Sequence, residues 1–175
     1  MRAFGVGPAS VSGLSTALDR MAGVQHVVSA SANIPAPPER VYGLIADYRN
    51  GHSRILPKQF SGLTVEKGGI GAGTVIRFQM RLMGKTRTYR GAVTEPEPGR
   101  VLVEAYSEPN HSVTTFRVDP GSGPGESHVT ISTQLAVQDG LPGRIERWLI
   151  TRMLNPIYLK ELEILARVAE EDIPK

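Results

Sequence analysis

The titratable side chains best placed to carry chemistry are Glu104, Arg117 and Tyr89, each in a stretch where apolar and polar residues alternate. Such alternation predicts β-strands, in which each side chain points to one face of a sheet. Glu104 shares its face with Leu102 and Tyr106, and a charge facing inward there would need a partner or a ligand. A carboxyl group in an apolar site has a raised pKa, which suits it to general acid–base catalysis. The simpler expectation is that Glu104 and Arg117 both face solvent.

The other candidate residues do not form a metal or phosphate site by their spacing. The motif GGIGAG, residues 68–73, lies between two predicted strands, so we expect a hairpin loop rather than a phosphate cradle at a helix N-terminus. His52 follows a short predicted helix, where a surface position is expected and a place near a pocket mouth is the alternative. No cysteine and no nucleophile motif is present, so we expect neither metal nor cofactor. The four histidines are scattered along the chain: His26, His52, His111 and His128.

The composition is that of an ordinary globular protein with a mild basic excess. The 175 residues are 40% hydrophobic and 21% charged, and the net charge is +3. We expect no nucleic-acid partner, because such proteins concentrate their charge on one face. The densest basic stretch surrounds a predicted turn at Met83 and Gly84, which favours a solvated hairpin tip over a patch for anions or membrane surfaces. No apolar run is long enough to span a membrane, and the absence of cysteine fits a cytoplasmic protein.

One short helix stands near the start of the predicted fold. Residues 24–35 alternate as a strand, and the segment PAPPERVYGLIADYRN, residues 35–50, follows. Pro37 and Pro38 suit a first helical turn, and the apolar residues from Val41 to Tyr48 recur at helical spacing. Residues 1–22 are too weakly hydrophobic for a secretory signal and are expected to form a flexible tail, and a chain beginning at Met21 would still hold every element.

The rest of the chain predicts an antiparallel meander and one long helix. Six short runs between residues 60 and 138 are separated by turn signals about every ten residues. Residues 141–171 then carry two apolar stripes at helical spacing, with a kink or break expected at Pro156. We therefore expect one α+β domain over residues 23–172, in which a curved sheet of about seven strands wraps around the terminal helix.

A curved sheet and a straight helix do not pack flush along their whole length, so this order of elements implies an internal pocket. Apolar pockets with a few polar anchors are typical ligand sites, whereas the alternative is plain core packing. The candidate lining residues are Phe78, Met80, Tyr89, Glu104, Tyr106, Phe116, Arg117, Trp148 and Met153.

This pattern resembles the START-like, or Bet v 1-like, helix-grip superfamily (SRPBCC), and within it the polyketide cyclase/dehydrase and lipid transport family. The resemblance covers residues 24–170 and is carried by the helix motif APPERVYGLIAD, the segments GRV and VTTFRVDP, and the final helix. Tyr42 stands where many relatives have tryptophan. The resemblance implies a helix-grip fold but no catalytic residues, because the family has no universal ones.

Three functions remain open on the sequence alone. The first is binding, and transport, of a small hydrophobic ligand such as a lipid, polyketide or isoprenoid. The second is a cyclase, aromatase or dehydratase in the same cavity, which would require at least two titratable side chains to converge there. The third is a carrier or chaperone that touches a membrane surface through the basic hairpin around Arg87. The sequence carries no indication of an oligomeric state.

Overall fold

One strongly curved antiparallel sheet and a long C-terminal helix make up the fold in the computed structural model, which describes residues 24–108 and 111–171. The expected tail, residues 1–22, lies outside the described residues. The strand order in the sheet is β1-β7-β6-β5-β4-β3-β2. Consecutive strands are therefore neighbours except β1 and β2, which lie at opposite edges because β1 pairs with β7. The elements are β1 (Val24–Ile34), α2 (Pro38–Ala46), α3 (His52–Ile55), β2 (Phe60–Lys67), β3 (Val75–Leu82), β4 (Lys85–Glu97), β5 (Val101–Glu108), β6 (Ser112–Pro120), β7 (Ser127–Val137) and α4 (Gly140–Glu171).

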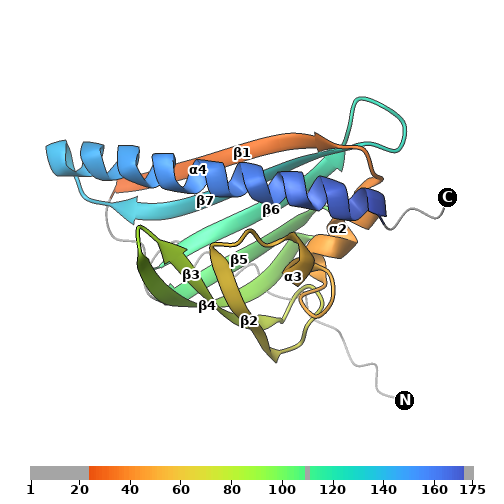
Figure 1. Cartoon of the computed structure of the whole chain (residues 1–175), viewed down its shortest axis with the longest axis horizontal. Helices are drawn as coiled ribbons and strands as arrows, with labels where there is room; N and C mark the ends of the chain where they lie inside the picture. The colour runs from red at the N-terminus through yellow and green to blue at the C-terminus, as the bar shows by residue number, and fades with distance from the viewer. Residues whose placement is uncertain (1–23, 109–110, 172–175) are drawn as a thin grey trace, which may run out of the picture.

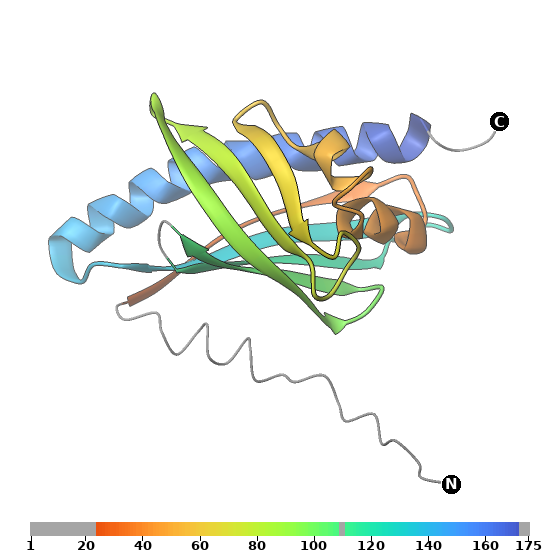
Figure 2. The same ribbon diagram turned by 90° about the horizontal axis from the view of Figure 1, so that it is seen from below.

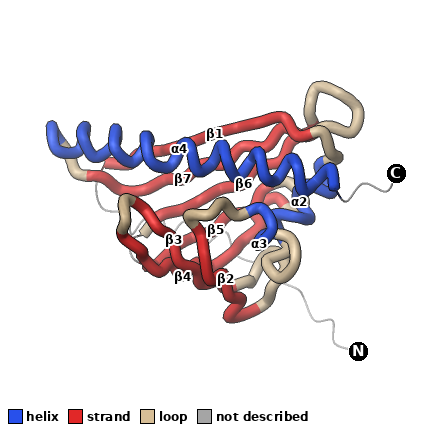
Figure 3. Tube along the Cα trace, in the orientation of Figure 1, coloured by secondary structure: helices blue, strands red, loops and turns tan. Residues whose placement is uncertain are grey.

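The strands form where the sequence alternates, because alternation places one apolar face against the core. In β7 every second residue from Ser127 to Val137 is buried, and in β3 the buried residues are Ile76, Phe78 and Met80. Figure 2 shows the sheet bending so that β2, β3 and β4 turn toward α4. The predicted helix-grip architecture is therefore confirmed, with two short helices after the first strand (Figure 3).

Helix α2 begins at the predicted prolines and ends earlier than its apolar spacing suggests. The helix stops at Ala46 because the side chain of Asp47 accepts hydrogen bonds from the backbone N–H groups of Arg49 (2.9 Å) and Asn50 (3.0 Å). Tyr48 lies just outside the helix and is nevertheless buried. The Tyr48 ring is thus placed in the interior by the turn at Asp47 and not by the periodicity of the helix.

The glycine-rich loop, residues 68–73, joins the α2–α3 segment to the far strands of the sheet. Tyr48 N–H donates to the carbonyl of Gly69, and Gly71 N–H donates to the carbonyl of Ala46, both at 2.9 Å. Gly71 has φ +56°, and a β-carbon there would collide with the Glu95 carboxylate. That carboxylate accepts hydrogen bonds from the Ala72 N–H and from the hydroxyl of Tyr42 on α2. The loop connects β2 to β3, as the hairpin interpretation predicted, and it closes one end of the curved sheet.

Helix α4 is continuous through Pro156, so of the expected kink or break the structure excludes the break. Pro156 lies on the exposed side of the helix, where water can satisfy the carbonyl group that loses its N–H partner. The half after Pro156 packs on the core through a buried stripe, whereas the half before it lies over the cavity and its first turns project past the sheet in Figure 1. That first half exposes large apolar side chains: Leu141, Ile145, Trp148 and Leu149.

Candidate functional site

A cavity of about 730 Å³ lies between the curved sheet and α4. Its closed end is lined by nearly fully buried residues that include His52, Phe116 and Ile131. Its mouth lies between the first half of α4, at Ile145, and the tip of the β3–β4 hairpin, at Met83. The expected gap between sheet and helix is thus a hollow that the protein's own side chains do not fill.

An aromatic cluster from four neighbouring strands forms one wall. The ring of Phe78 on β3 stacks on Tyr89 on β4, with 5.3 Å between centroids, and contacts Tyr106 on β5 edge-on at 5.7 Å. Phe60 on β2 packs against Phe78 from the other side at 5.5 Å. Gly91 is the register partner of Tyr106, and a β-carbon there would come within 2.8 Å of the tyrosine ring. Glycine at this position therefore lets Tyr106 lie flat across β4 and complete the wall.

Glu104 lies at the base of this wall and is 3% exposed, so the expectation that it faces solvent is wrong. Its Oε1 accepts a hydrogen bond of 2.5 Å from the hydroxyl of Tyr48, and its Oε2 accepts one from Tyr106. Burial, followed by the charge of Glu104, raises the pKa of both tyrosines well above 10. Both hydroxyls therefore remain donors, and these two bonds offset much of the cost of burying the carboxyl group.

His52 also lies inside the protein, which corrects the expected surface position. Its Nδ1 is 2.7 Å from the carbonyl oxygen of Ile45, and because a carbonyl only accepts, Nδ1 carries a proton. The imidazole stacks on Tyr48 at 4.5 Å and meets Phe116 edge-on at 5.7 Å. Its Nε2 consequently faces Glu104, with 3.8 Å to Oε1.

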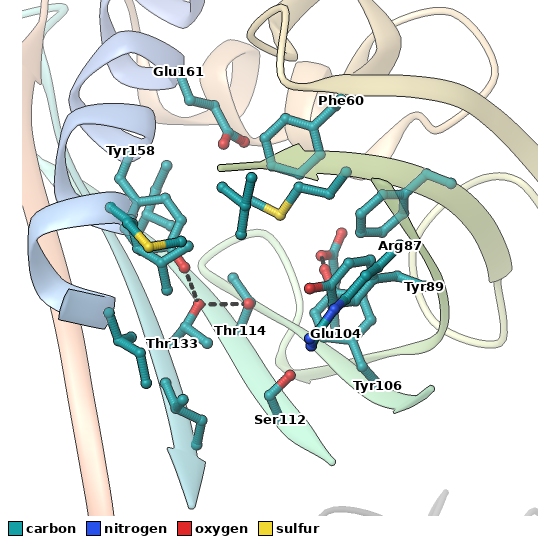
Figure 4. Close-up of a pocket in the computed structure, with 18 of the residues that line it drawn as sticks. Phe60, Arg87, Tyr89, Glu104, Tyr106, Ser112, Thr114, Thr133, Tyr158 and Glu161 are labelled. Carbon is teal, nitrogen blue, oxygen red and sulfur yellow. Dashed lines mark hydrogen bonds between the residues drawn. The ribbon is translucent and has the colours of Figure 1, made fainter. Parts of the chain in front are cut away.

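Glu161 reaches the cavity from α4 on the opposite side (Figure 4). The residue is 3% exposed, and among the described residues its carboxyl group has no hydrogen-bond partner. Burial, together with the nearby carboxyl of Glu104, raises the pKa of Glu161 to about 8. At neutral pH the group is therefore mostly a neutral acid whose O–H can donate a hydrogen bond into the cavity.

A short chain of hydroxyl groups runs from α4 to the sheet. Tyr158 lies 2.5 Å from the Oγ1 of Thr133, which lies 2.7 Å from the Oγ1 of Thr114. All three residues line the cavity, and the dashed lines in Figure 4 mark these two contacts. The chain links the helix to β7 and β6 and adds polar atoms to an otherwise apolar wall.

The sequence of residues 25–170 matches the sequence model of the polyketide cyclase / dehydrase and lipid transport family. The chain belongs to this family. No curated protein matches the chain. Among solved structures, the KanY protein is 27% identical, with a TM-score of 0.73, and the alignment covers 84% of this chain and 99% of that one.

Two further structures support the fold of this family member. The Zhui aromatase/cyclase from a Streptomyces species is 16% identical, with a TM-score of 0.71 and coverage of 86% of this chain and 97% of that one. A START superfamily protein from Mycobacterium smegmatis is 14% identical, with a TM-score of 0.66 and coverage of 83% and 98%. The helix-grip fold that the resemblance implied is thereby confirmed.

Within this family member, most of the residues predicted to line a pocket lie at the cavity surface. Two do not. Arg117 points away from the cavity, as the simpler expectation had it and against its place among the candidate lining residues, and it pairs with Glu97 (3.5 Å) and Asp119 (3.9 Å). Trp148 is 61% exposed and is corrected, since it lies on a side of α4 that does not line the cavity, unlike Ile145 and Leu149. The predicted residues that line the cavity are Phe78, Met80, Tyr89, Glu104, Tyr106, Phe116 and Met153.

Sequence reasoning missed Glu161, although a signal for it exists. The carboxyl residue lies three residues after Tyr158 and four before Leu165, within the apolar stripe of the helix rather than on its polar side. A charged residue inside such a stripe indicates a buried polar site. Among the described residues no three histidine, aspartate or glutamate side chains are grouped as metal ligands, and no described helix is long and apolar enough to cross a membrane.

Proposed function

We propose that the protein binds a small hydrophobic ligand, such as a lipid, a polyketide or an isoprenoid, in the cavity beneath α4. The observation that carries the proposal is the cavity itself, whose volume of about 730 Å³ falls in the range of small-molecule sites. Its walls expose mainly aromatic and aliphatic surface, and charged and hydroxyl side chains are set among these apolar residues. Transport, rather than storage, would require exchange through the mouth between α4 and the β3–β4 hairpin.

A matched pair of tryptophan substitutions tests the proposal. Met153→Trp places a large ring into the cavity from α4, whereas Leu159→Trp adds the same ring at a half-exposed position of the same helix that does not line the cavity. Binding of anilinonaphthalene sulfonate, followed by fluorescence, should weaken at least tenfold in the first variant and stay unchanged in the second. Equal binding in both would refute an internal site. Native mass spectrometry of protein purified from its own host would then identify the bound molecule by its mass.

A second candidate function, a cyclase, aromatase or dehydratase-type enzyme, is favoured by one observation. At least two titratable side chains converge in the cavity, since Glu104 and Glu161 line it from opposite sides and His52 lies beside Glu104. Loss of water from a β-hydroxy ketone needs an acid to protonate the leaving hydroxyl group and a base to take the proton from carbon. The protonated Glu161 fits the first role. His52 Nε2, which faces Glu104, fits the second when it is unprotonated.

The enzyme candidate is tested with the aldol adduct of benzaldehyde and acetone, whose dehydration to benzylideneacetone is followed by ultraviolet absorbance. Turnover that falls at least a hundredfold in Glu161→Gln, with binding of anilinonaphthalene sulfonate unchanged, supports this candidate. Binding without turnover of this adduct favours the binding function.

A further inference from the structure

Two carboxyl groups and an imidazole lie in the enclosed part of the cavity. His52, Glu104 and Glu161 are each 3% exposed, whereas the charged lining residues on the β3–β4 hairpin at the mouth, Lys85 and Arg87, are exposed. Burying a carboxyl group without a partner is costly. Two buried carboxyl groups would therefore not be expected in a cavity that bound its ligands by hydrophobic contact alone. The arrangement indicates that the ligand is not apolar along its whole length.

Glu161 is the buried carboxyl group whose hydrogen-bonding capacity is left open for a ligand atom. Its carboxyl group is almost fully buried, points into the cavity and, among the described residues, is hydrogen-bonded to none. Glu104, by contrast, already accepts hydrogen bonds from Tyr48 and Tyr106. Of the two carboxyl groups, Glu161 is therefore the one that can still hydrogen-bond to a ligand.

The hydroxyl chain also has a donor to spare. Tyr158, Thr133 and Thr114 carry three O–H groups, and the two contacts between them use two protons. No other hydrogen bond of these hydroxyls is found among the described residues, so one O–H is left for an acceptor in the cavity. Two separate features, the acid on α4 and the hydroxyl chain beside it, thus both call for an acceptor atom on the ligand.

We propose that the ligand carries a ketone- or quinone-type carbonyl oxygen and binds with that end first, so that its oxygen accepts a hydrogen bond from Glu161. The proposal rests on the ligand-binding function proposed above. The apolar body of the ligand then lies along the aromatic wall and its far end at the mouth. A cationic amine fits less well, because it would have to draw the proton off Glu161 and would leave the spare hydroxyl donor without an acceptor.

Several groups face Glu161 from the elements packed around it. They are Glu104 and Tyr106 on β5, Tyr48 before α3, His52 on α3 and Tyr158 on α4. The pKa of each of these tyrosines is raised, first by burial, so all three hydroxyls stay protonated across the range in which Glu161 titrates. When Glu161 loses its proton the donor is lost, and the affinity for a carbonyl ligand falls as the pH rises through about 8.

Two naphthalenes that differ only at one substituent, acetyl or isopropyl, provide the test. They have nearly the same shape, and only the first has a carbonyl oxygen. At pH 7 the wild-type protein should bind the acetyl compound about two- to tenfold more tightly, as one net hydrogen bond gives. Glu161→Met, which keeps the side-chain volume and loses the donor, should abolish the preference. Glu161→Gln keeps an N–H donor and should retain it.

The pH profile distinguishes the carboxyl group from its neighbours. Between pH 7 and pH 9.5 the preference for the acetyl compound should decline in the wild type and stay flat in Glu161→Gln, which still holds His52 and Glu104. Equal affinity of the wild type for both compounds, or a preference that survives Glu161→Met, would overturn the proposal. Tighter binding of naphthylmethylamine than of either compound would overturn it in favour of a cationic head group. Failure of every compound to bind would instead refute the ligand-binding function on which the proposal depends.

Discussion

Replacing Glu161 with glutamine should make the stability of the protein much less sensitive to pH. The pKa of Glu161 is raised from 4.5 to about 8 in the folded protein, chiefly by burial, so between these values the folded state holds a proton that the unfolded state releases. Stability must then fall as the pH rises, by about 1.4 kcal/mol per pH unit. The loss reaches about 3 kcal/mol at pH 7 and about 5 kcal/mol above pH 8, where the folded state is also ionised. Glutamine does not titrate, so Glu161→Gln removes this dependence.

Urea unfolding followed by circular dichroism at pH 5, 7 and 9 measures the effect. The difference in unfolding free energy between the variant and the wild type should increase by about 3 to 4 kcal/mol from pH 5 to pH 9, in favour of the variant. Glu163→Gln is the matched control, because Glu163 is exposed on the same helix and pairs with Lys160 at 2.7 Å. Parallel stability curves for the wild type and Glu161→Gln would refute the conclusion that this carboxyl group is buried and protonated.

Three further substitutions test the scaffold around the cavity. Tyr48→Phe removes one donor to the buried Glu104 and should lower the unfolding free energy by about 1–3 kcal/mol in urea titrations; no loss would mean that this hydrogen bond is not formed. Gly71→Ala should lower the thermal midpoint more than Gly73→Ala, because both have positive φ but only the methyl group at 71 meets the glutamate carboxylate that holds the loop. Equal midpoints would contradict the packing of that loop. Pro156→Ala restores a helical hydrogen bond, so it should raise the thermal midpoint. Because the stiffer helix would move less at the mouth of the cavity, the release of anilinonaphthalene sulfonate should slow in stopped-flow fluorescence. Unchanged kinetics would show that the first half of α4 does not control exchange.

The fold could be predicted from the sequence because its strands have one buried face and its turns carry glycine and proline. Each of the seven predicted strands is present, and the buried face of β3 is the one that the alternation of Ile76, Phe78 and Met80 indicates. The break that was one of the two expectations at Pro156 is absent, because the penalty for a proline within a helix depends on whether its orphaned carbonyl can reach water. That exposure is a property of the packed structure and not of the local sequence.

The site could be predicted only in part, because alternation gives the face of a side chain but not what lies opposite to it. Glu104 was recognised as a candidate, yet its burial depends on hydrogen bonds from Tyr48, which is 56 residues distant in the chain, and from Tyr106. Trp148 has the spacing of a core residue and is exposed, since its side of α4 does not face the cavity. Glu161 could have been found from its place in an apolar stripe, whereas the cavity opposite to it could not.

The glycine-rich loop helps to close one end of the cavity. Its backbone bonds to Ala46 and Tyr48 tie down the segment that carries Tyr48, His52 and Ile55, and all three of these side chains are almost inaccessible to water. Among the described residues this end of the cavity is enclosed, so the part of a ligand that enters first between α4 and the β3–β4 hairpin lies deepest. A ligand longer than the cavity would leave its tail at the mouth, beside the exposed apolar side chains of α4 at Leu141, Ile145 and Leu149.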